Sequence, residues 1–437
     1  MSVSLTVSRC PDVPTGCGLS GGFPDGSGSM PVPLGTLKKF ASTRIPPRKS
    51  KGGDRRVAAR AERFALQAVA RRLLPDEGVA SCLRAVLPSR QRVDVFHQPK
   101  HQSASFGGLQ VCGSPWACPV CAQRIAERRR LELERAIVAH RAAGGVVLIA
   151  ALTVSHTRHD VLRTLLGMLL TAVKELQSGR PWTRLREAYG LLGMVRALET
   201  TWGPVHGWHP HVHLLLFLDA PAGWGSASAQ DHAAWLATFQ ADLYRQWEYA
   251  AASQGLAMDR EHGLVVQQTD GAVMDYVAKW GCQPAARPWG PEDELTKANL
   301  KHARVSEDAQ DAGRRYSPFD LLRQVLATGE VSGPGALFCE YVWAFKGRSQ
   351  LRWTPELRKR VLPEETEETD EEVARRHDAD AVLLGSLSLE DWGAVLGADA
   401  RAAVLTAAAT GEWVAVLVVV DGAYAVVADV GSLAADP

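Results

Sequence analysis

Hydrophobic and polar positions alternate along the middle of this 437-residue chain in the two periods typical of strands and helices. Short apolar stretches in which every second residue is apolar predict strands, and longer ones with apolar residues every three or four positions predict helices. The pattern predicts strands over 146–155, 191–201, 210–218 and 263–268, and helices over 158–178, 229–253 and 270–280. We expect an α+β domain, because this β-α-β-β-α-β order suits a ferredoxin-like antiparallel sheet.

The segments outside this region carry their own signals. Helical spacing over 57–86 predicts a helical entry to the folded part, and 124–135 is a strongly helical, basic stretch. Ser317 followed by Pro318 predicts a helix start, and 343–353 resembles a strand and turn. Valine-rich pieces around Asp421-Gly422 predict a β-hairpin in a small C-terminal module.

The net charge of +1 conceals two segments of opposite sign. Residues 38–60 hold nine Lys and Arg against the single acidic residue Asp54, and 363–372 is an almost continuous acidic run. The basic segment could contact phosphates in a salt-sensitive way, whereas the acidic run more readily solvates a linker. Plain solvation is the alternative for both.

Eight cysteines at irregular spacing do not form the disulfide framework of a small secreted protein, so we expect a reducing compartment. Three of them, Cys112, Cys118 and Cys121, have the crowding of a Zn²⁺ site. Cys82 is the favoured fourth ligand, with His101 or His97 as replacements, and buried cysteines without a ligand are the alternative. The sequence shows neither a secretory leader nor an apolar stretch long enough for a membrane span, which predicts a cytoplasmic protein.

Three histidines, His209, His211 and His213, stand at two-residue steps where the strand predicted over 210–218 begins. Side chains two apart on a strand share a face, so these imidazoles would converge in the way that suits a divalent cation. A half-buried strand that carries polar histidines is the alternative. A hairpin between the two central strands would bring Glu199 close to the histidines.

Further along, Tyr276 and Lys279 lie three residues apart, on one face of the helix predicted over 270–280. Alone, they would be an ordinary amphipathic pair. A histidine pair followed by Tyr-x-x-Lys is the order of parts in an HUH nucleic-acid endonuclease.

Residues 80–360 resemble the single-tyrosine rolling-circle replication initiators of plasmids, in particular the actinobacterial type. Leu152-Thr-Val-Ser-His156 resembles the first motif of that family, 112–121 its cysteine cluster, and 345–353 a late basic segment. The resemblance implies an HUH domain whose histidines hold Mg²⁺ or Mn²⁺, with Glu199, or else His209, as the third ligand. An ion pair between Glu199 and Arg196 is the alternative role for that carboxylate.

In such a domain Tyr276 is the nucleophile that leaves a 5′-phosphotyrosine and a free 3′-hydroxyl primer, and Lys279 assists it. Some relatives carry a glutamate one turn before the tyrosine, where this chain has Ala272. Termination by hydrolysis or by a second transfer therefore stays open. Zn²⁺ at the cysteines would have a structural role, positioning the basic helix on DNA.

The implied partners are plasmid origin DNA, presented single-stranded or as a hairpin, and a host helicase and polymerase, with no membrane. An HUH transposase or relaxase, or a non-catalytic zinc-dependent DNA-binding regulator, are the alternatives. The residues expected to contact DNA are Arg124, Arg128, Arg129, Lys346 and Arg348. The expected segments are a disordered basic arm (1–56), a helical and cysteine-cluster DNA-binding segment (57–140), the HUH nicking domain (141–285), a closing segment that contacts DNA (286–362), an acidic linker (363–377) and the C-terminal module (378–437).

Overall fold

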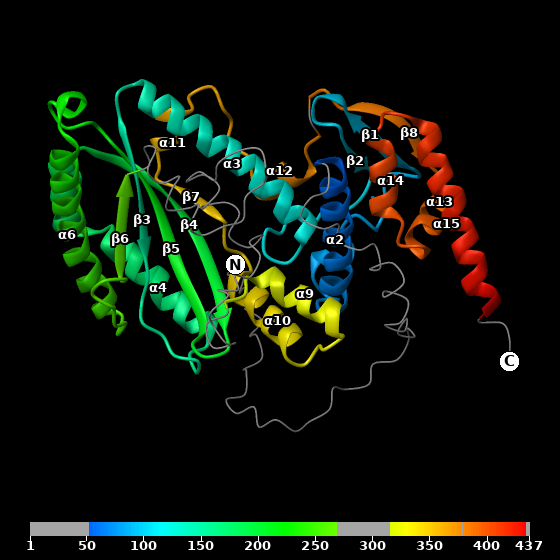
Figure 1. Cartoon of the computed structure of the whole chain (residues 1–437), viewed down its shortest axis with the longest axis horizontal. Coiled ribbons are helices and arrows are strands. Elements are labelled where there is room, and N and C mark those ends of the chain that lie inside the picture. Colours follow the sequence, from blue (N-terminus) through cyan, green and yellow to red (C-terminus); the bar gives the residue numbers. More distant parts are fainter. Residues whose placement is uncertain (1–51, 269–314, 378, 434–437) are drawn as a thin grey trace, which may run out of the picture. The chain divides into compact units, whose positions relative to one another are not determined.

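The computed structural model describes residues 52–268, 315–377 and 379–433 (Figure 1). All of them lie in one unit of the chain, Thr43–Pro437. Two antiparallel sheets and a set of helices make up this part, so the predicted α+β class is confirmed. The predicted N-terminal arm lies outside the described residues except for its last five, which begin a helix. The predicted helix 270–280 also lies outside them.

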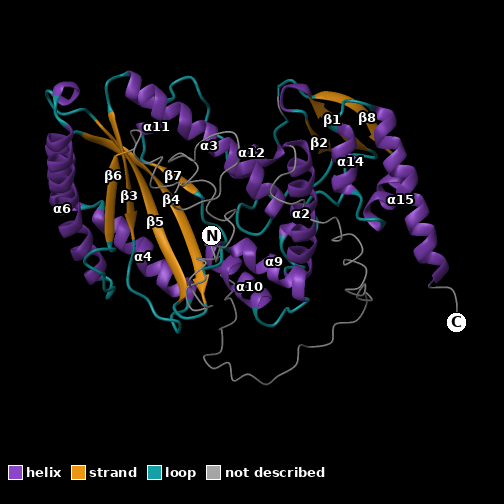
Figure 2. Ribbon diagram, viewed as in Figure 1, coloured by secondary structure: helices purple, strands orange, loops and turns teal. Residues whose placement is uncertain are grey.

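The larger sheet has five strands in the order β6-β3-β5-β4-β7, with antiparallel neighbours throughout (Figure 2). The predicted central strands are all present, and β7 is a short edge strand. The bounds are β3 Val146–Leu152, β4 Leu191–Gly203, β5 Gly207–Leu218, β6 Leu264–Gln268 and β7 Leu351–Trp353.

Helices cover both faces of this sheet. On one face, α4 (Leu162–Leu176) and α6 (Ala229–Ser253) pack with the even-numbered residues of β5, such as Val212 and Leu216. On the other, α3 (Pro119–Ala142) and α11 (Leu357–Val361) pack with odd-numbered residues such as Phe217. This alternation follows from the two-residue period of strands, and it leaves the histidines of β5 on the α3 face.

Between β3 and β4 the single predicted helix is in fact two, α4 and the shorter α5 (Gly179–Tyr189). The basic stretch 124–135 lies inside α3, which contacts both β3 and α2 (Gly52–Leu73) (Figure 1). The predicted start at Ser317 is confirmed: the Ser317 side chain and Asp320 form a capping box on α9 (Pro318–Thr328).

The second sheet joins distant parts of the chain in the order β2-β1-β8. β1 (Val93–Gln98) and β2 (Ser103–Gly107) form a hairpin, and β8 (Val382–Leu387) pairs with β1. The C-terminal segment continues with α13 (Leu389–Gly397), α14 (Arg401–Ala408) and α15 (Trp413–Leu433).

The hairpin predicted around Asp421-Gly422 is wrong, because α15 runs through both residues. Val416, Val420 and Ala423 are buried at helical spacing, and α15 contacts α13 and α14. A continuous valine-rich run suits a buried strand or a helix equally, and here tertiary packing selects the helix.

The strand and turn predicted over 343–353 are right only at their end. Helix α10 (Pro334–Phe345) includes Trp343 in its last turn, and β7 begins at Leu351. The acidic run does not lie free in solvent, because its helix α12 (Asp370–Arg375) contacts α3. Short 3-10 turns complete the described elements: η1 Gly78–Ala80, η2 Pro99–His101 and η3 Trp224–Ser226. None of the described helices is both long and apolar enough to cross a membrane.

Candidate functional site

The β4–β5 hairpin sets the histidines opposite the glutamate. Glu199 is the register partner of His211, while Ala197 faces His213 and Thr201 faces His209. Gly207, which begins β5, has a φ of +72°, and a Cβ there would lie 2.8 Å from the Cα of Arg158. Only glycine fits this turn easily, and the turn fixes the register that brings Glu199 to the histidines.

One carboxylate oxygen of Glu199 lies between two imidazoles. Its Oε2 is 3.2 Å from Nε2 of His211 and 3.1 Å from Nε2 of His213. The ligand atoms of the three residues all lie within 4.8 Å of one another. The side chain of Glu199 is only 5% exposed, so its charge is largely removed from water.

The hydrogen bonding of His211 is compatible with a cation in this group. Its Nδ1 lies 3.3 Å from the carbonyl oxygen of His209 and must donate there, because a carbonyl only accepts. In the neutral ring Nε2 then carries a lone pair, which faces a carboxylate oxygen that is also an acceptor. Only a proton on the ring or a metal ion between the two atoms makes that contact favourable. Two imidazole nitrogens and one carboxylate oxygen fit a divalent metal.

The third histidine, His209, lies outside this group and pairs with His156. Nδ1 of His209 is 2.6 Å from Nε2 of His156, and Nδ1 of His156 is 3.0 Å from the carbonyl oxygen of His206. His156 therefore donates to that carbonyl and accepts from His209. Burial first, and then the charges of His211 and Arg315, lower the pKa of His209 to about 2. The geometry thus groups Glu199, rather than His209, with the histidine pair.

The sequence pattern gives His156 a place only in the first motif and does not predict its contact with His209. Burial is also the main cause that lowers the pKa of His156. Its place in the segment 152–156, directly after β3, was the signal that could have indicated this role.

Four cysteines converge at the N-terminal end of α3. Cys118 is the N-cap of α3, Cys121 lies in its first turn, and Cys82 and Cys112 come from turns before it. The sulfur atoms of Cys82 and Cys121 are 3.5 Å apart, those of Cys112 and Cys121 3.7 Å, and those of Cys118 and Cys82 3.8 Å. A tetrahedral Zn²⁺ with Zn–S bonds of about 2.3 Å separates its sulfurs by about 3.8 Å.

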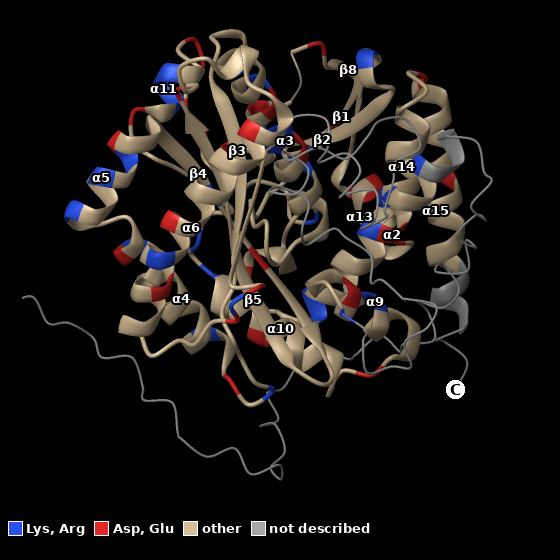
Figure 3. Ribbon diagram, turned by 60° about the vertical axis from the view of Figure 1, so that its left-hand side comes forward, with Lys and Arg blue, Asp and Glu red and all other residues tan. Residues whose placement is uncertain are grey.

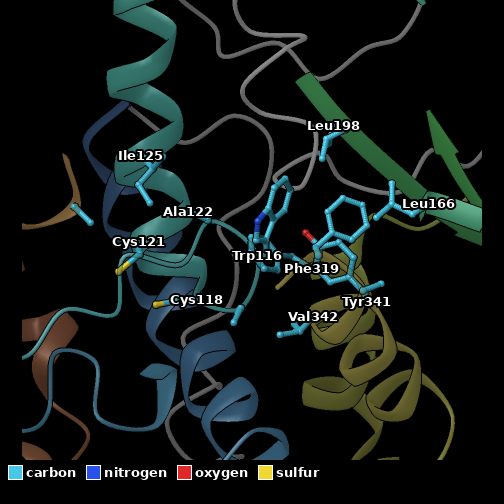
Figure 4. Close-up of a cluster of buried hydrophobic side chains, with 14 of the residues drawn as sticks. Trp116, Cys118, Cys121, Ala122, Ile125, Leu166, Leu198, Phe319, Tyr341 and Val342 are labelled. Carbon is cyan, nitrogen blue, oxygen red and sulfur yellow. The ribbon is translucent and has the colours of Figure 1, made fainter. Parts of the chain in front are cut away.

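The surroundings of these thiols also suit a metal. All four are free of disulfides, and Cys82 and Cys118 are fully buried. Burial opposes ionisation of Cys118, but hydrogen bonds from the other three thiols outweigh it and hold the pKa of Cys118 well below its usual range. Figure 4 shows Cys118 and Cys121 at the start of α3, close to the buried Trp116. The expected set of four, with Cys82 as the last member, is compatible with a metal.

Several of the residues expected to contact DNA are engaged within the chain. The guanidinium of Arg129 lies 3.0 Å from Asp370 of α12, and Arg124 donates to the carbonyl oxygen of Ala374. Lys346 pairs with Glu77 at 2.6 Å. Figure 3 shows Lys and Arg interspersed with Asp and Glu over the elements in view.

The other two residues expected to contact DNA are Arg128 and Arg348. Arg128 is half-buried on α3, and Arg348 lies in the turn between α10 and β7, where its Nε donates to the carbonyl oxygen of Ala344. Tyr276, Lys279 and Ala272 lie outside the described residues. Their roles stay predictions.

Comparison with known proteins shows similarity to replication proteins. Residues 106–303 match the family model described as a replication protein. A Streptomyces lividans protein named "Protein rep" is 28% identical over an alignment of 344 residues, covering 66% of this chain and 73% of that protein. A Streptomyces cyanogenus protein named "Neomycin resistance protein" is 30% identical over 148 residues, covering 28% of this chain and 34% of that protein. No solved structure gives a significant match. The resemblance predicted from the motifs is thus confirmed: the chain is similar to replication proteins, including one from Streptomyces.

Proposed function

We propose that this protein initiates rolling-circle replication of a plasmid by nicking one strand of the origin DNA. The nick would form a 5′-phosphotyrosine on the protein and leave a free 3′-hydroxyl as primer, and a later transfer would rejoin or release the strand. The observation that carries the proposal is the contact of Glu199 with both His211 and His213, an arrangement compatible with a bound metal in a chain similar to replication proteins.

The topology of the larger sheet supports an HUH domain. Strands β3, β4, β5 and β6 follow the chain order β-α-β-β-α-β and lie in the order β6-β3-β5-β4, which is the ferredoxin-like arrangement. The histidines stand on β5, the middle of the five strands, and face away from α4 and α6. A rigid central strand holds ligands in fixed geometry.

The residues present fit the metal that such a domain uses. Glu199, His211 and His213 would hold Mg²⁺ or Mn²⁺, with coordination positions left for a phosphate oxygen and water. When bound, the cation would stabilise negative charge that develops on the scissile phosphate. The imidazole–carboxylate set favours Mn²⁺ intrinsically, while cellular abundance favours Mg²⁺.

Tyr276 would carry out the transfer. Its phenolate oxygen would bond to phosphorus as the bond from phosphorus to the 3′-oxygen breaks, and the departing oxygen would take up a proton to become the primer hydroxyl. Lys279, three residues on in the sequence, would stabilise the phenolate and the phosphate charge. With Ala272 in the place of a possible water-activating glutamate, a second transfer is the simpler way to end the cycle.

The cysteine group would hold Zn²⁺ with a structural role. The four thiols connect the start of α3 to the turns at Cys82 and Cys112. Fixing these turns would set the position of α3, whose apolar residues Leu133 and Ile137 pack on the sheet face that carries the histidines.

Covalent capture of DNA tests the proposal. The purified protein, its Tyr276→Phe variant and a matched Tyr249→Phe control, altered at an exposed tyrosine of α6, would be incubated with Mn²⁺ and labelled single-stranded oligonucleotides that tile a candidate origin. We expect an adduct that survives denaturation with the native and control proteins and is lost with Tyr276→Phe or a chelator. The absence of any adduct with native protein, with Mn²⁺ or Mg²⁺, would favour a non-catalytic DNA-binding regulator instead.

A further inference from the structure

Three arginines gather where β4 pairs with the edge strand β7, on the face of the larger sheet opposite to Glu199. They have no acidic partner among the described residues. Arg196 of β4 and Arg352 of β7 are register partners, so they lie side by side on one face of the antiparallel pair. Arg348 comes from the turn that leads into β7. Among the described residues, none of these three guanidinium groups forms an ion pair with a carboxylate. We call them the arginine group.

This arrangement is electrostatically unfavourable as it stands. Like charges directly opposite on neighbouring strands repel, because their Cβ atoms are only about 5 Å apart. Arg196 is half-buried, and its Nε is shielded from solvent with no hydrogen-bond partner in the part of the chain that the structure describes. Burial first, and then the charges of Arg352 and Arg348, lower the pKa of Arg196 to about 10.

The surrounding structure holds the group in place. The indole nitrogen of Trp116 donates to the carbonyl oxygen of Arg348 at 2.7 Å, and the Nε of Arg348 donates to Ala344. Arg163, in the first turn of α4, adds positive charge that, after burial, lowers the pKa of Arg348. The carboxylate of Glu340 lies at the first turn of α4, where it accepts hydrogen bonds from the backbone nitrogen of Leu162 and the indole nitrogen of Trp208.

We infer that the arginine group is a phosphate-binding site for the backbone of the DNA strand. Guanidinium groups bind phosphate oxygens through paired, charge-assisted hydrogen bonds, and an anion would offset the repulsion among the three. The inference rests on the proposed function only in taking DNA as the ligand. Phosphate contacts of this kind position a strand without reading its sequence.

The position of the arginine group relative to the histidines suits a DNA strand that passes the edge of the sheet. Arg196 and Glu199 are three residues apart on β4, about 10 Å along the strand, and they point to opposite faces. The edge strand β7 has only three residues, and Arg352 is exposed there. DNA held by the arginine group could therefore pass around β7 to reach the face that carries Glu199.

A cavity nearby is a poorer phosphate site. It has a volume of about 570 Å³ and lies between the turn at Cys112, the turn at Arg348 and the acidic segment. Glu367, Glu368 and Glu371 line it, and their charges would repel a phosphate. Arg348 also lines this cavity, whereas Arg196 and Arg352 are not among its lining residues.

Equilibrium binding distinguishes this inference from the nicking proposal. Fluorescence anisotropy of a labelled single-stranded oligonucleotide would be measured at several salt concentrations in a Tyr276→Phe background, where strand transfer plays no part. Arg352→Gln and Arg196→Gln would be compared with Arg184→Gln, a change at an exposed arginine of α5 outside the group. Nicking would be measured separately on chains that keep Tyr276.

We expect each change in the arginine group to weaken binding and to reduce the slope of log K against log salt by about 0.7, the value for one lost phosphate contact on a single strand. Arg352→Lys, which keeps the charge but not the paired geometry, should recover part of the loss. The melting temperature of Arg352→Gln should not fall, because a repulsion is removed. Unchanged affinity and slope in both glutamine variants would overturn the inference, as would a fall in melting temperature that accounts for the whole loss. Strong competition by millimolar inorganic phosphate, with unchanged DNA affinity in the variants, would indicate a site for the free anion and would also overturn it.

Discussion

Replacing Cys82 with serine tests whether the four cysteines form a zinc site. The three measured sulfur separations of 3.5, 3.7 and 3.8 Å lie close to the tetrahedral edge of about 3.8 Å. We therefore expect one equivalent of zinc in the purified protein, with four sulfur neighbours at about 2.3 Å in X-ray absorption. Cys82→Ser should lower or abolish that zinc content.

The expected loss of stability follows from binding linkage. A ligand that binds only the folded state stabilises it by about 4 kcal/mol when its free concentration is 1,000 times Kd. At about 2 °C for each kcal/mol in a large domain, losing that contribution lowers the melting temperature by about 8 °C. The measurement is a melting curve with metal analysis of the same sample.

Cys339→Ser is the matched control. Cys339 is also a free, half-buried cysteine, but its Sγ donates to the carbonyl oxygen of Leu73, outside the group of four. It should keep the zinc and nearly the full melting temperature. If the native protein holds no zinc, or if Cys82→Ser keeps a full equivalent and melts like Cys339→Ser, the reasoning from sulfur geometry is wrong.

Three further outcomes are expected. Glu199→Gln should weaken Mn²⁺ binding, measured by calorimetry, by at least about 10-fold. The metal-free variant should be as stable as the native protein, because the glutamine amide can donate a hydrogen bond to a histidine lone pair, whereas a carboxylate can only accept. In metal-free protein, urea unfolding should show stability falling as the pH drops below about 6.5, since His209, with a folded pKa of about 2, stays neutral while the unfolded chain binds the proton. His209→Gln should reduce that slope by up to about 1.4 kcal/mol per pH unit, and an unchanged slope would contradict the assigned burial. Gly113→Ala should destabilise the fold more than Gly144→Ala in denaturant titrations: both have positive φ, but only at Gly113 does a Cβ meet a neighbour, 2.7 Å from the Cα of Glu371.

Local pattern was enough to predict the part of the fold that positions the candidate site. The two-residue period placed the histidines on one face of β5, and the short turn before them gave the hairpin that brings Glu199 opposite His211. Cys82 could be chosen as a partner for Cys112, Cys118 and Cys121 because a tetrahedral Zn²⁺ site needs a fourth ligand.

The remaining parts of the fold depend on packing between residues far apart in the sequence, which a local pattern cannot predict. Strand β8 pairs with β1 across almost 290 residues, and the valine-rich run of α15 is a helix because α13 and α14 pack on it. The acidic run contacts α3 because Arg129 and Arg135 lie where Asp370 and Glu365 can reach them. The contact of His156 with His209 likewise depends on how the segment after β3 folds over the hairpin.

The central claim is that Tyr276 attacks a DNA phosphate beside the Glu199, His211 and His213 group. Its most direct test is to digest the covalent protein–DNA adduct and identify by mass spectrometry the residue that carries the 5′-phosphate. The account predicts a nucleotide on Tyr276, formed with Mn²⁺ by the native protein and lost in His211→Ala and His213→Ala. A nucleotide on any other residue, or the same yield from both histidine variants, would contradict it.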